Sequence, residues 1–477
     1  MKCILTCIAL VLLSTLHAEE NATTLRAGAA TSNITLPLGA RNGGVIARGA
    51  EAKQIHDELH ARCLVLDDGS AQLAIVVCDL RMIDREVIEQ ARALACEATK
   101  IPPEHVLISA THTHAAPGVI GIHTDELGLW YREFLVRRIA DGIIRAHGNL
   151  APARIGWGAG SVPGQVFNRR WHMKEGTIPP NPFGEAGDQV RMNPPRQSPD
   201  LIEPAAPADP ELMVLSVQHE DGRPLALLAN YGVHYVGGYQ GGHVSADYFG
   251  IFAERMKDLL EAHSSDPPFV AIMSNGTSGD TNNINFRKPR EAKEPWQKMR
   301  EVAHELADEA LRVYQEIEYR ESVLLAAEVV DLELGVRRPD DERIAWAKKT
   351  LDPTGIDSPK KLNGRAVIYA QEALELAKFP PKMPVRLQAL RIGDLGITAV
   401  PCEVFAETGL TIKEQTPLEA TFTIELANGY NGYLPTPRQH EWGGYETWPA
   451  RSSYLEVEAE SAIRRTLLEL LDRVANR

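Results

Sequence analysis

The sequence from 105 to 118 reads His-Val-Leu-Ile-Ser-Ala-Thr-His-Thr-His-Ala-Ala-Pro-Gly, an apolar run that ends in two histidines and a turn. A short β-branched run bounded by Gly and Pro predicts a buried strand, here over 105–110. A strand repeats its side-chain direction every two residues, so His112 and His114 are predicted to point to the same face. Neutral imidazole nitrogens are frequent zinc ligands, although only one of the two need bind. Two half-exposed structural histidines are the alternative interpretation.

Outward from this run, seven further apolar runs predict strands at 61–66, 73–78, 225–229, 269–273, 322–330, 390–400 and 422–426. Amphipathic patterns between them predict helices at 86–99, 128–147, 248–263, 293–319, 341–351, 365–378 and 456–475. The fold class is therefore predicted to be mixed α/β, with a β-sheet core flanked by helices. Residues 164–210 are crowded with Pro, Gly, Asn and Asp and predict a long surface excursion of the kind that often shapes a binding site.

Composition and the N-terminus limit the class of protein. The 477 residues are 44% hydrophobic, enough for a substantial core, and no repeat or linker divides the chain. A formal charge of -14 repels phosphate backbones and argues against a nucleic-acid partner. The charged start, the apolar run 4–13 and Ala18 are typical of a secretory signal, which predicts a signal peptide at 1–18 and a single secreted or periplasmic domain at 19–477. No later segment approaches the ~20 apolar residues that a transmembrane helix requires.

The cysteines argue against a thiolate site. Beyond the predicted signal, Cys63, Cys78, Cys96 and Cys402 are scattered without any Cys-x-x-Cys spacing. Cys63 and Cys78 lie inside apolar runs, where a free cysteine usually behaves as a small buried hydrophobe. A disulfide framework and a cysteine-bound zinc are both disfavoured.

Other apolar runs also end in polar or titratable residues, and active sites of sheet proteins are commonly built at strand ends. One run leads to His234, which alone is more often a structural histidine. Another leads into the loop 274–283, whose backbone amides could face an anion or simply form a tight polar turn. Glu403 ends a third run, and Tyr433 and Tyr445 lie in a turn-rich segment where packing aromatics are the alternative.

Taken in order, these segments resemble the neutral/alkaline non-lysosomal ceramidase family. Residues 27–37, AGAATSNITLP, are similar to the family's opening strand, and residues 54–69, QIHDELHARCLVLDDG, resemble its next one. The most specific stretch is SATHTHAAPG at 109–118, where the family counterpart differs mainly by Ser-Gly in place of Ala115-Ala116. Matching blocks extend from about Arg26 to Thr447, and the resemblance implies the fold of the family's catalytic domain.

The resemblance also implies a zinc centre. In the family, two histidines, a glutamate and a tyrosine hold the ion, and these fall on His112, His234, Glu403 and Tyr433. The resemblance likewise implies that three further residues, His114, Arg169 and Tyr445, orient the scissile amide or stabilise its oxyanion. Zinc with nitrogen and oxygen ligands and an open position lowers the pKa of bound water to ~7, which produces a nucleophile for an acyl carbon. The implied function is an exported zinc-dependent amidohydrolase that cleaves an N-acyl bond such as that of ceramide.

Two departures bear on the substrate. The ceramidases carry Ser-Asn-x-Gly-Asp in the loop after the run 269–273, and alignment of Gly279-Asp280 puts Gly276 at the serine, with Ser274 and Ser278 on either side. The ceramidases also add a C-terminal immunoglobulin-like domain, whereas this sequence is expected to lack one. The predicted zinc ligands are unaffected by either departure.

Two other hypotheses therefore stay open. One is a hydrolase on the same scaffold that acts on a carbohydrate or another polar amide or ester. The other is a non-catalytic exported protein that holds a structural metal, for which a closed site would be usual. The expected partner is a small-molecule or lipid substrate, with transient contact to a membrane surface if it is a lipid, and the sequence does not predict the oligomeric state.

Overall fold

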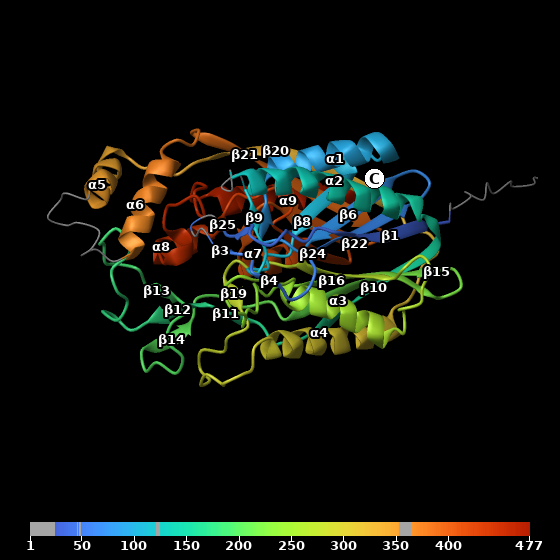
Figure 1. Ribbon diagram of the computed structural model, residues 1–477, viewed down its shortest axis with the longest axis horizontal. Coiled ribbons are helices and arrows are strands. Elements are labelled where there is room, and N and C mark those ends of the chain that lie inside the picture. Colours follow the sequence, from blue (N-terminus) through green and yellow to red (C-terminus); the bar gives the residue numbers. More distant parts are fainter. Residues whose placement is uncertain (1–23, 45, 47–48, 121–124, 353–363) are drawn as a thin grey trace, which may run out of the picture.

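Two β-sheets face each other in the computed structural model, and helices cover their outer faces (Figure 1). The structure describes residues 24–44, 46, 49–120, 125–352 and 364–477, so the predicted signal peptide at 1–18 lies outside the described residues. The predicted mixed α/β class, with a sheet core flanked by helices, is confirmed. Among the described residues, none of the helices combines the length and the apolar character needed to cross a bilayer.

The larger sheet has eight strands in the order β18-β16-β15-β10-β1-β5-β6-β8. In chain order these strands are β1 (Arg26–Asn33), β5 (His60–Asp67), β6 (Gln72–Cys78), β8 (Val106–Ala110), β10 (Ala151–Ser161), β15 (Glu211–His219), β16 (Pro224–Tyr231) and β18 (Val270–Asn275). The pairs β6/β8 and β16/β18 at its two edges are parallel, and the pairs between them are antiparallel. Strand β18 contacts β5, β6 and β8 although it lies at the other end of the strand order, which shows that the sheet is strongly curved. The C-terminal ends of the two parallel edge pairs therefore lie close together.

The smaller sheet closes the concave side of the larger one. Its strands are β20 (Leu325–Gly335), β21 (Lys382–Ile392), β22 (Leu395–Val400) and β24 (Ala420–Glu425), in that order, and β22 and β24 are parallel. Alternate side chains of both sheets, among them Leu64, Ile75, Leu215, Ile397 and Phe422, form the dry core between them. Burial of such side chains is the main force that holds the two sheets together.

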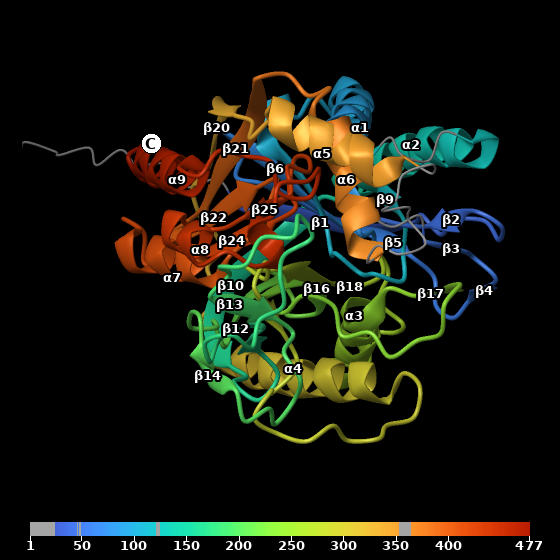
Figure 2. The same cartoon turned by 90° about the vertical axis from the view of Figure 1, so that its left-hand side faces the viewer.

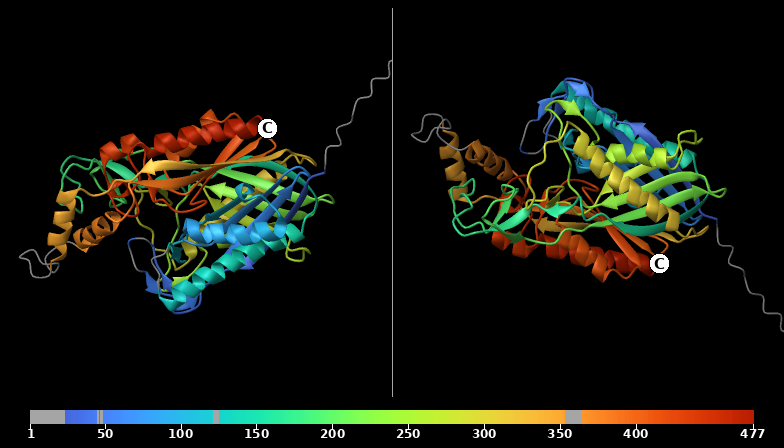
Figure 3. Two further views of the ribbon diagram at one scale, coloured as in Figure 1. Left: turned by 90° about the horizontal axis from the view of Figure 1, so that it is seen from above. Right: turned by 90° about the horizontal axis from the view of Figure 1, so that it is seen from below.

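Helices complete the outer layers. The larger sheet is covered by α1 (Arg85–Thr99) and α2 (Glu126–Gly148) on one half and by α3 (Asp247–Leu259) and α4 (Gln297–Glu316) on the other (Figure 2). The smaller sheet is covered by α9 (Ala459–Ala475), with α7 (Ala406–Gln415) beside it (Figure 3). Helix α1 begins where the sequence predicts it, because Asp84 caps it by accepting a hydrogen bond from the Val87 amide at 3.0 Å.

Short elements surround the ends of the sheets. The helical pair α5 (Asp341–Leu351) and α6 (Gly364–Leu376) packs through Ala347, Ala370 and Ala373 and projects from the body (Figure 1). The remaining elements are β2 (Arg41–Asn42), β3 (Ala50–Glu51), β4 (Gln54–Ile55), β7 (Met82–Ile83), η1 (Pro103–His105), β9 (Gly118–Val119), β11 (Phe167–Asn168), β12 (Arg170–Met173), β13 (Val190–Met192), β14 (Leu201–Pro204), β17 (His243–Val244), β19 (Thr281–Asn282), β23 (Glu403–Val404), β25 (Tyr433–Leu434), α8 (Pro437–Trp442) and η2 (Tyr445–Thr447).

Two predictions of secondary structure need correction, and strands β10 and β15 of the larger sheet were not predicted. The run 390–400 is not one strand, because Gly393 at φ 60° reverses the chain between β21 and β22. The predicted surface excursion at 164–210 contains the three-stranded sheet of β12, β13 and β14. Strand β10 was not predicted, since its glycines hide the apolar pattern; a Cβ on Gly156 would lie 2.4 Å from the Glu318 carbonyl oxygen. Cys63 and Cys78 are buried and free, as predicted.

The core between the sheets provides a test of this arrangement. Ile397 is fully buried there, so Ile397→Ala leaves a cavity and is expected to lower the free energy of unfolding by about 2–5 kcal/mol. Ile202 is 50% exposed, and Ile202→Ala is expected to change it by less than about 0.5 kcal/mol. Denaturant unfolding measures both, and equal effects would contradict the packing described.

Candidate functional site

The residues predicted for the site meet where strands of both sheets end. His112 and His114 follow β8, His234 follows β16, Glu403 lies in β23 directly after β22, and Tyr433 lies in β25 after β24. Strands β23 and β25 pair in parallel with Glu403 opposite Tyr433, which places their side chains at the same level. The structure also brings Arg169 and Tyr445 to this place. The geometry thus unites all seven residues, whose roles remain predictions.

Two imidazoles face each other at the centre. The Nε2 atoms of His112 and His234 are 3.0 Å apart, and the two rings are nearly perpendicular. The other ring nitrogens form hydrogen bonds with backbone carbonyl oxygens. Nδ1 of His112 lies 2.7 Å from the Arg81 carbonyl oxygen, and Nδ1 of His234 lies 3.1 Å from the Ser278 carbonyl oxygen. A carbonyl can only accept a hydrogen bond, so each Nδ1 carries a proton, and in the neutral form of each ring Nε2 then presents a lone pair. In neutral rings two lone pairs at this distance repel each other unless a proton or a metal ion lies between them.

His114 joins the same cluster from the edge. Its Nε2 is 3.3 Å from Nε2 of His112, and its ring stacks on Tyr235 with centroids 3.7 Å apart. Ligand nitrogens of His112, His114 and His234 all lie within 4.8 Å of one another. Burial lowers the pKa of both His114 and His234 well below the ordinary value, and the neighbouring cationic groups act in the same direction.

His112 owes its position to a left-handed backbone. Its φ is 70°, and its amide donates to the Leu80 carbonyl oxygen at 2.9 Å. Strand β8 has already ended at Ala110, so the two-residue alternation that predicted a common face for His112 and His114 does not apply there. Such a conformation is rare for a residue other than glycine and is typical of functional sites.

Glu403 supplies an unpaired oxygen beside the imidazoles. Its Oε2 is buried and has no hydrogen-bond donor among the described residues, and it lies 3.3 Å from Nε2 of His112 and 3.8 Å from Nε2 of His234. Its Oε1 accepts a hydrogen bond from the Tyr430 hydroxyl at 2.9 Å. Burial acts to raise the pKa of Glu403, but His112, Arg169 and Tyr433 outweigh it and hold that pKa below its ordinary value.

This donor set fits a metal ion. Three imidazole nitrogens and one carboxylate oxygen converge, and the oxygen is buried without a hydrogen-bond partner among the described residues, so a cation would satisfy it. The outer nitrogens of His112 and His234 donate to backbone carbonyls, the arrangement that fixes the tautomer of metal-binding histidines. The described residues can therefore hold a metal ion at this place.

One cationic side chain, Arg169, and two phenolic side chains, Tyr433 and Tyr445, lie against the cluster. Arg169 donates to Glu446 Oε1 at 2.9 Å and to the Tyr433 hydroxyl at 3.1 Å. Burial acts to lower the pKa of Arg169, but Tyr433, Glu446 and Glu403 raise it overall, so the guanidinium stays charged. Burial first, and Glu403 next, raise the pKa of Tyr433 well above its ordinary value and that of Tyr445 to about 12. The Tyr433 and Tyr445 rings pack edge to face, 5.8 Å apart.

A second buried carboxylate holds the supporting loops together. Glu425, at the end of β24, accepts hydrogen bonds from the Ser278 hydroxyl and amide, from the Asn275 side chain and from the Val404 amide. It thereby joins the loop that supports His234 to the residue that follows Glu403. The loop amide of Ser278 was predicted to be able to face an anion, and in the structure it faces this carboxylate of the protein itself.

Gly276 lies in a confined place in the same loop. A Cβ there would approach the Gly232 amide nitrogen at 2.9 Å and Asn230 Oδ1 at 3.0 Å, so a serine would require its neighbours to move. The Ser274 hydroxyl donates to the Ala229 carbonyl oxygen, and the Ser278 hydroxyl donates to Glu425. Both serines that flank Gly276 are therefore engaged within the protein.

Fold and cluster together define an α/β protein with a candidate metal centre at the ends of its strands. Residues 28–295 match the family described as neutral/alkaline non-lysosomal ceramidase, N-terminal. This range is more than half of the sequence, and the chain belongs to that family of hydrolases. The match includes His112, His114, Arg169 and His234, whereas Glu403, Tyr433 and Tyr445 lie beyond it.

Individual relatives agree with this assignment. The chain is 26% identical over 240 residues to neutral ceramidase A of Dictyostelium discoideum, which covers 47% of this chain and 31% of the relative. It is 25% identical over 249 residues to the neutral ceramidase of Pseudomonas aeruginosa, covering 49% of this chain and 33% of the relative. The aligned segments thus span about a third of these relatives.

Solved structures show the same fold. The crystal structure of the neutral ceramidase from Pseudomonas aeruginosa superposes with a TM-score of 0.68 at 18% identity, covering 95% of this chain and 74% of that one. A ceramidase complexed with C2 gives a TM-score of 0.69 at 19% identity, covering 95% and 75%. The likeness therefore extends over nearly the whole chain, beyond the range of the family match.

Tyr430 is a functional candidate that the sequence did not single out. Tyr430→Phe removes the donor to Glu403 Oε1 and is expected to weaken the affinity for a divalent metal about 10-fold or more, as loss of a supporting hydrogen bond commonly does. Tyr131 is a buried tyrosine remote from the cluster that donates to the Ile34 carbonyl oxygen, so Tyr131→Phe is the matched control. Competition with a metal indicator measures the affinity, and equal affinities in both variants would contradict a role for Tyr430.

Proposed function

We propose that this protein is a zinc-dependent amidohydrolase that cleaves an N-acyl bond of the kind found in ceramide. The observation that carries the proposal is the pair of facing Nε2 lone pairs of His112 and His234 beside the orphaned oxygen of Glu403. Nitrogen and oxygen donors without thiolate suit zinc in a catalytic rather than a structural site. Tyr433 completes the proposed ligand set. Membership of a ceramidase family supports the reaction class.

The proposed reaction adds water to the acyl carbon and releases a carboxylic acid and an amine. Zinc, when bound, supplies a coordinated water of pKa about 7 and polarises the acyl carbonyl. His112, His234, Glu403 and Tyr433 hold the ion. His114, which is neutral because burial lowers its pKa, takes a proton from the attacking water and then gives it to the leaving nitrogen.

Negative charge that develops on the acyl oxygen is met by Arg169 and Tyr445. The Arg169 guanidinium is fixed by Glu446 and Tyr433, so it is oriented before the substrate arrives. A preorganised donor of this kind contributes about 3–4 kcal/mol to stabilisation of the transition state. The weakly acidic Tyr445 hydroxyl remains a donor throughout the neutral pH range.

A cavity of about 340 Å³ beside Tyr445 supports an apolar acyl group. Apolar and aromatic side chains make up much of its lining, among them Ile178, Pro179, Ile368 and Trp448. Cavities of this size and character take small apolar ligands or parts of larger ones. An acyl chain that enters here would bring its carbonyl to Tyr445, and contact with a membrane surface would follow if the substrate is a lipid.

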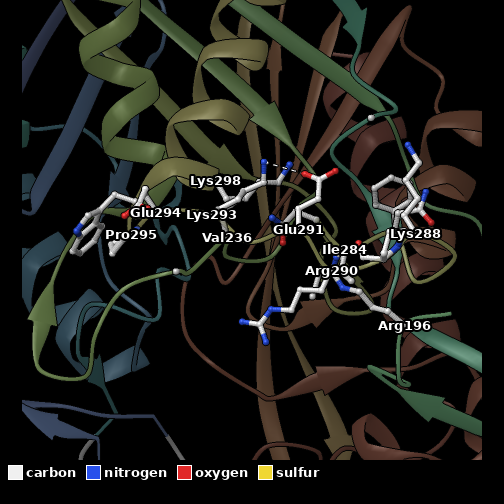
Figure 4. A pocket seen from close by; sticks show the side chains of 17 residues that line it. Arg196, Val236, Ile284, Lys288, Arg290, Glu291, Lys293, Glu294, Pro295 and Lys298 are labelled. Atoms are coloured by element: carbon white, nitrogen blue, oxygen red, sulfur yellow. Dashed lines mark hydrogen bonds and ion pairs between the residues drawn. The ribbon is translucent and has the colours of Figure 1, made fainter. Parts of the chain in front are cut away.

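A polar substrate is the second candidate. A hollow of about 510 Å³ near the site is lined mainly by charged and polar residues (Figure 4). A hydrolase that acts on a carbohydrate or another polar amide or ester would use such a surface. Release of sphingosine from ceramide at a rate comparable with that of polar substrates would count against this candidate.

Export remains part of the proposal. The signal-like N-terminus supports a secreted or periplasmic location for a domain that spans 19–477. N-terminal sequencing of the protein recovered from its native compartment tests both the cleavage after Ala18 and the location.

The metal is the first point to test. Purified protein is expected to contain about one zinc per chain, to lose amidase activity on N-acyl sphingosine with a chelator, and to regain it with zinc. His112→Ala removes a proposed ligand and is expected to abolish both zinc content and activity, whereas His263→Ala changes an exposed histidine and serves as the control. Elemental analysis and product release provide the measurements. Full activity in His112→Ala would refute the proposal.

The oxyanion role is tested at Tyr445. Tyr445→Phe removes only the hydroxyl and is expected to lower kcat about 100-fold with little change in KM, because the donor acts in the transition state. Tyr369 lines the same cavity, and its hydroxyl has no hydrogen-bond partner among the described residues. Tyr369→Phe is therefore the matched control and should keep near wild-type kcat. An unchanged kcat in Tyr445→Phe would remove this residue from the mechanism.

A further inference from the structure

A hollow next to the metal cluster is rich in positive charge. Its volume is about 510 Å³, and its lining includes five cationic and two acidic side chains (Figure 4). The cationic ones are Arg196, Lys288, Arg290, Lys293 and Lys298. The chain as a whole carries a formal charge of -14, so this concentration of positive charge runs against its average. We call this hollow the basic cleft.

Some of these cations are not neutralised within the protein. Lys293 pairs with Glu301 at 2.8 Å and with Glu291 at 3.2 Å, and Lys298 donates to Gln165 Oε1 at 2.6 Å. Neither Lys288 nor Arg290 forms an ion pair or a side-chain hydrogen bond within the part of the chain that the structure describes, and the Arg196 guanidinium reaches only a backbone carbonyl oxygen, that of Pro289. Cations with free donors that line one concave surface favour an anion there.

The basic cleft is lined in part by residues close in sequence to two of the proposed site residues. Val236 and Gly238 line it and follow His234 on the same loop, which is fixed because the Val236 and Gly237 amides donate to Asp247 at 3.2 and 3.0 Å. Phe167 lines another side and precedes Arg169. An occupant of the cleft would therefore lie against the two segments that carry His234 and Arg169.

We infer that the basic cleft binds an anionic oxygen group, a carboxylate, sulfate, sulfonate or phosphate, carried by the molecule on which the metal site acts. This inference rests on the proposed function for the identity of the reaction, but the binding of an anion does not depend on it. Arg290 and Lys288 are the recognising groups. The preferred substrate is then an N-acyl compound with a negatively charged end, hydrolysed faster than a neutral one with the same acyl chain.

Binding of inorganic sulfate to the full chain tests the cleft directly. Titration calorimetry at constant ionic strength is expected to show binding that persists after treatment with a chelator. The double variant Lys288→Ala/Arg290→Ala is expected to bind about 10-fold more weakly, since two charge-assisted contacts are lost. Arg300, an exposed arginine outside the lining, provides the control Arg300→Ala, which should bind as the wild type does. Equal affinity in the double variant, or binding that disappears with the chelator alone, would overturn the inference.

A pair of amide substrates tests the link to the reaction. N-dodecanoyl taurine and N-dodecanoyl ethanolamine share the acyl chain and the scissile bond and differ in a sulfonate against a hydroxyl. The inference predicts a kcat/KM about 10-fold higher for the taurine amide and loss of this preference in the double variant. Sulfate binding that depends on Lys288 and Arg290 without hydrolysis of either amide would support the cleft and count against the proposed function alone. Hydrolysis of both amides at equal rates would overturn the link between cleft and substrate.

Discussion

The structure around the site depends on two imidazole Nε2 atoms that lie 3.0 Å apart, while the Nδ1 atom of each ring is bound to a backbone carbonyl oxygen. Each ring is held in this orientation from behind, His112 by the Arg81 carbonyl oxygen and His234 by that of Ser278. The carbonyl oxygens fix both the Nδ1 proton and the orientation of each ring, so the fold itself brings the two Nε2 atoms face to face. His112 holds this position with a left-handed backbone conformation that is unfavourable outside glycine. A metal ion between the two rings would relieve the repulsion between their Nε2 atoms.

The supporting framework explains how residues far apart in sequence arrive at one point. The larger sheet curves until its edge pairs β6/β8 and β16/β18 approach each other, and the parallel pair β22/β24 of the smaller sheet faces the same region. Glu425 then connects the β18 loop to the segment after Glu403 by accepting donors from both. Because unpaired buried amides cost about 1–3 kcal/mol each, this carboxylate makes the two loops one unit. The candidate metal centre is thus held by segments anchored in the core.

Much of the fold and part of the site could be predicted from sequence, for reasons visible in particular residues. Strands such as β6 and β8 are short apolar runs that contain β-branched residues, and helix α1 has a clear amphipathic pattern. Strand β10 was missed because glycines that permit close packing against α4 and the residues after it also erase its apolar pattern. The ligand candidates were found by family resemblance. Tyr430 and Glu425 were not, since their partners lie far away in the chain and a single buried carboxylate or phenol leaves no local signal.

The surroundings of the cluster bear on the substrate more strongly than the cluster does. On the Tyr445 side the wall is largely apolar, although Asp188, Arg191 and Arg365 also line it, whereas on the side of Val236 and Gly238 the wall is basic. A neutral lipid would leave the second surface unused, and a sugar would leave the first unused. A molecule with an apolar acyl chain at one end and a negative charge at the other would use both, with its amide between them. At Gly276 a Cβ would approach the Gly232 amide nitrogen at 2.9 Å, so the loop has little room for the serine that the family resemblance implies at this position.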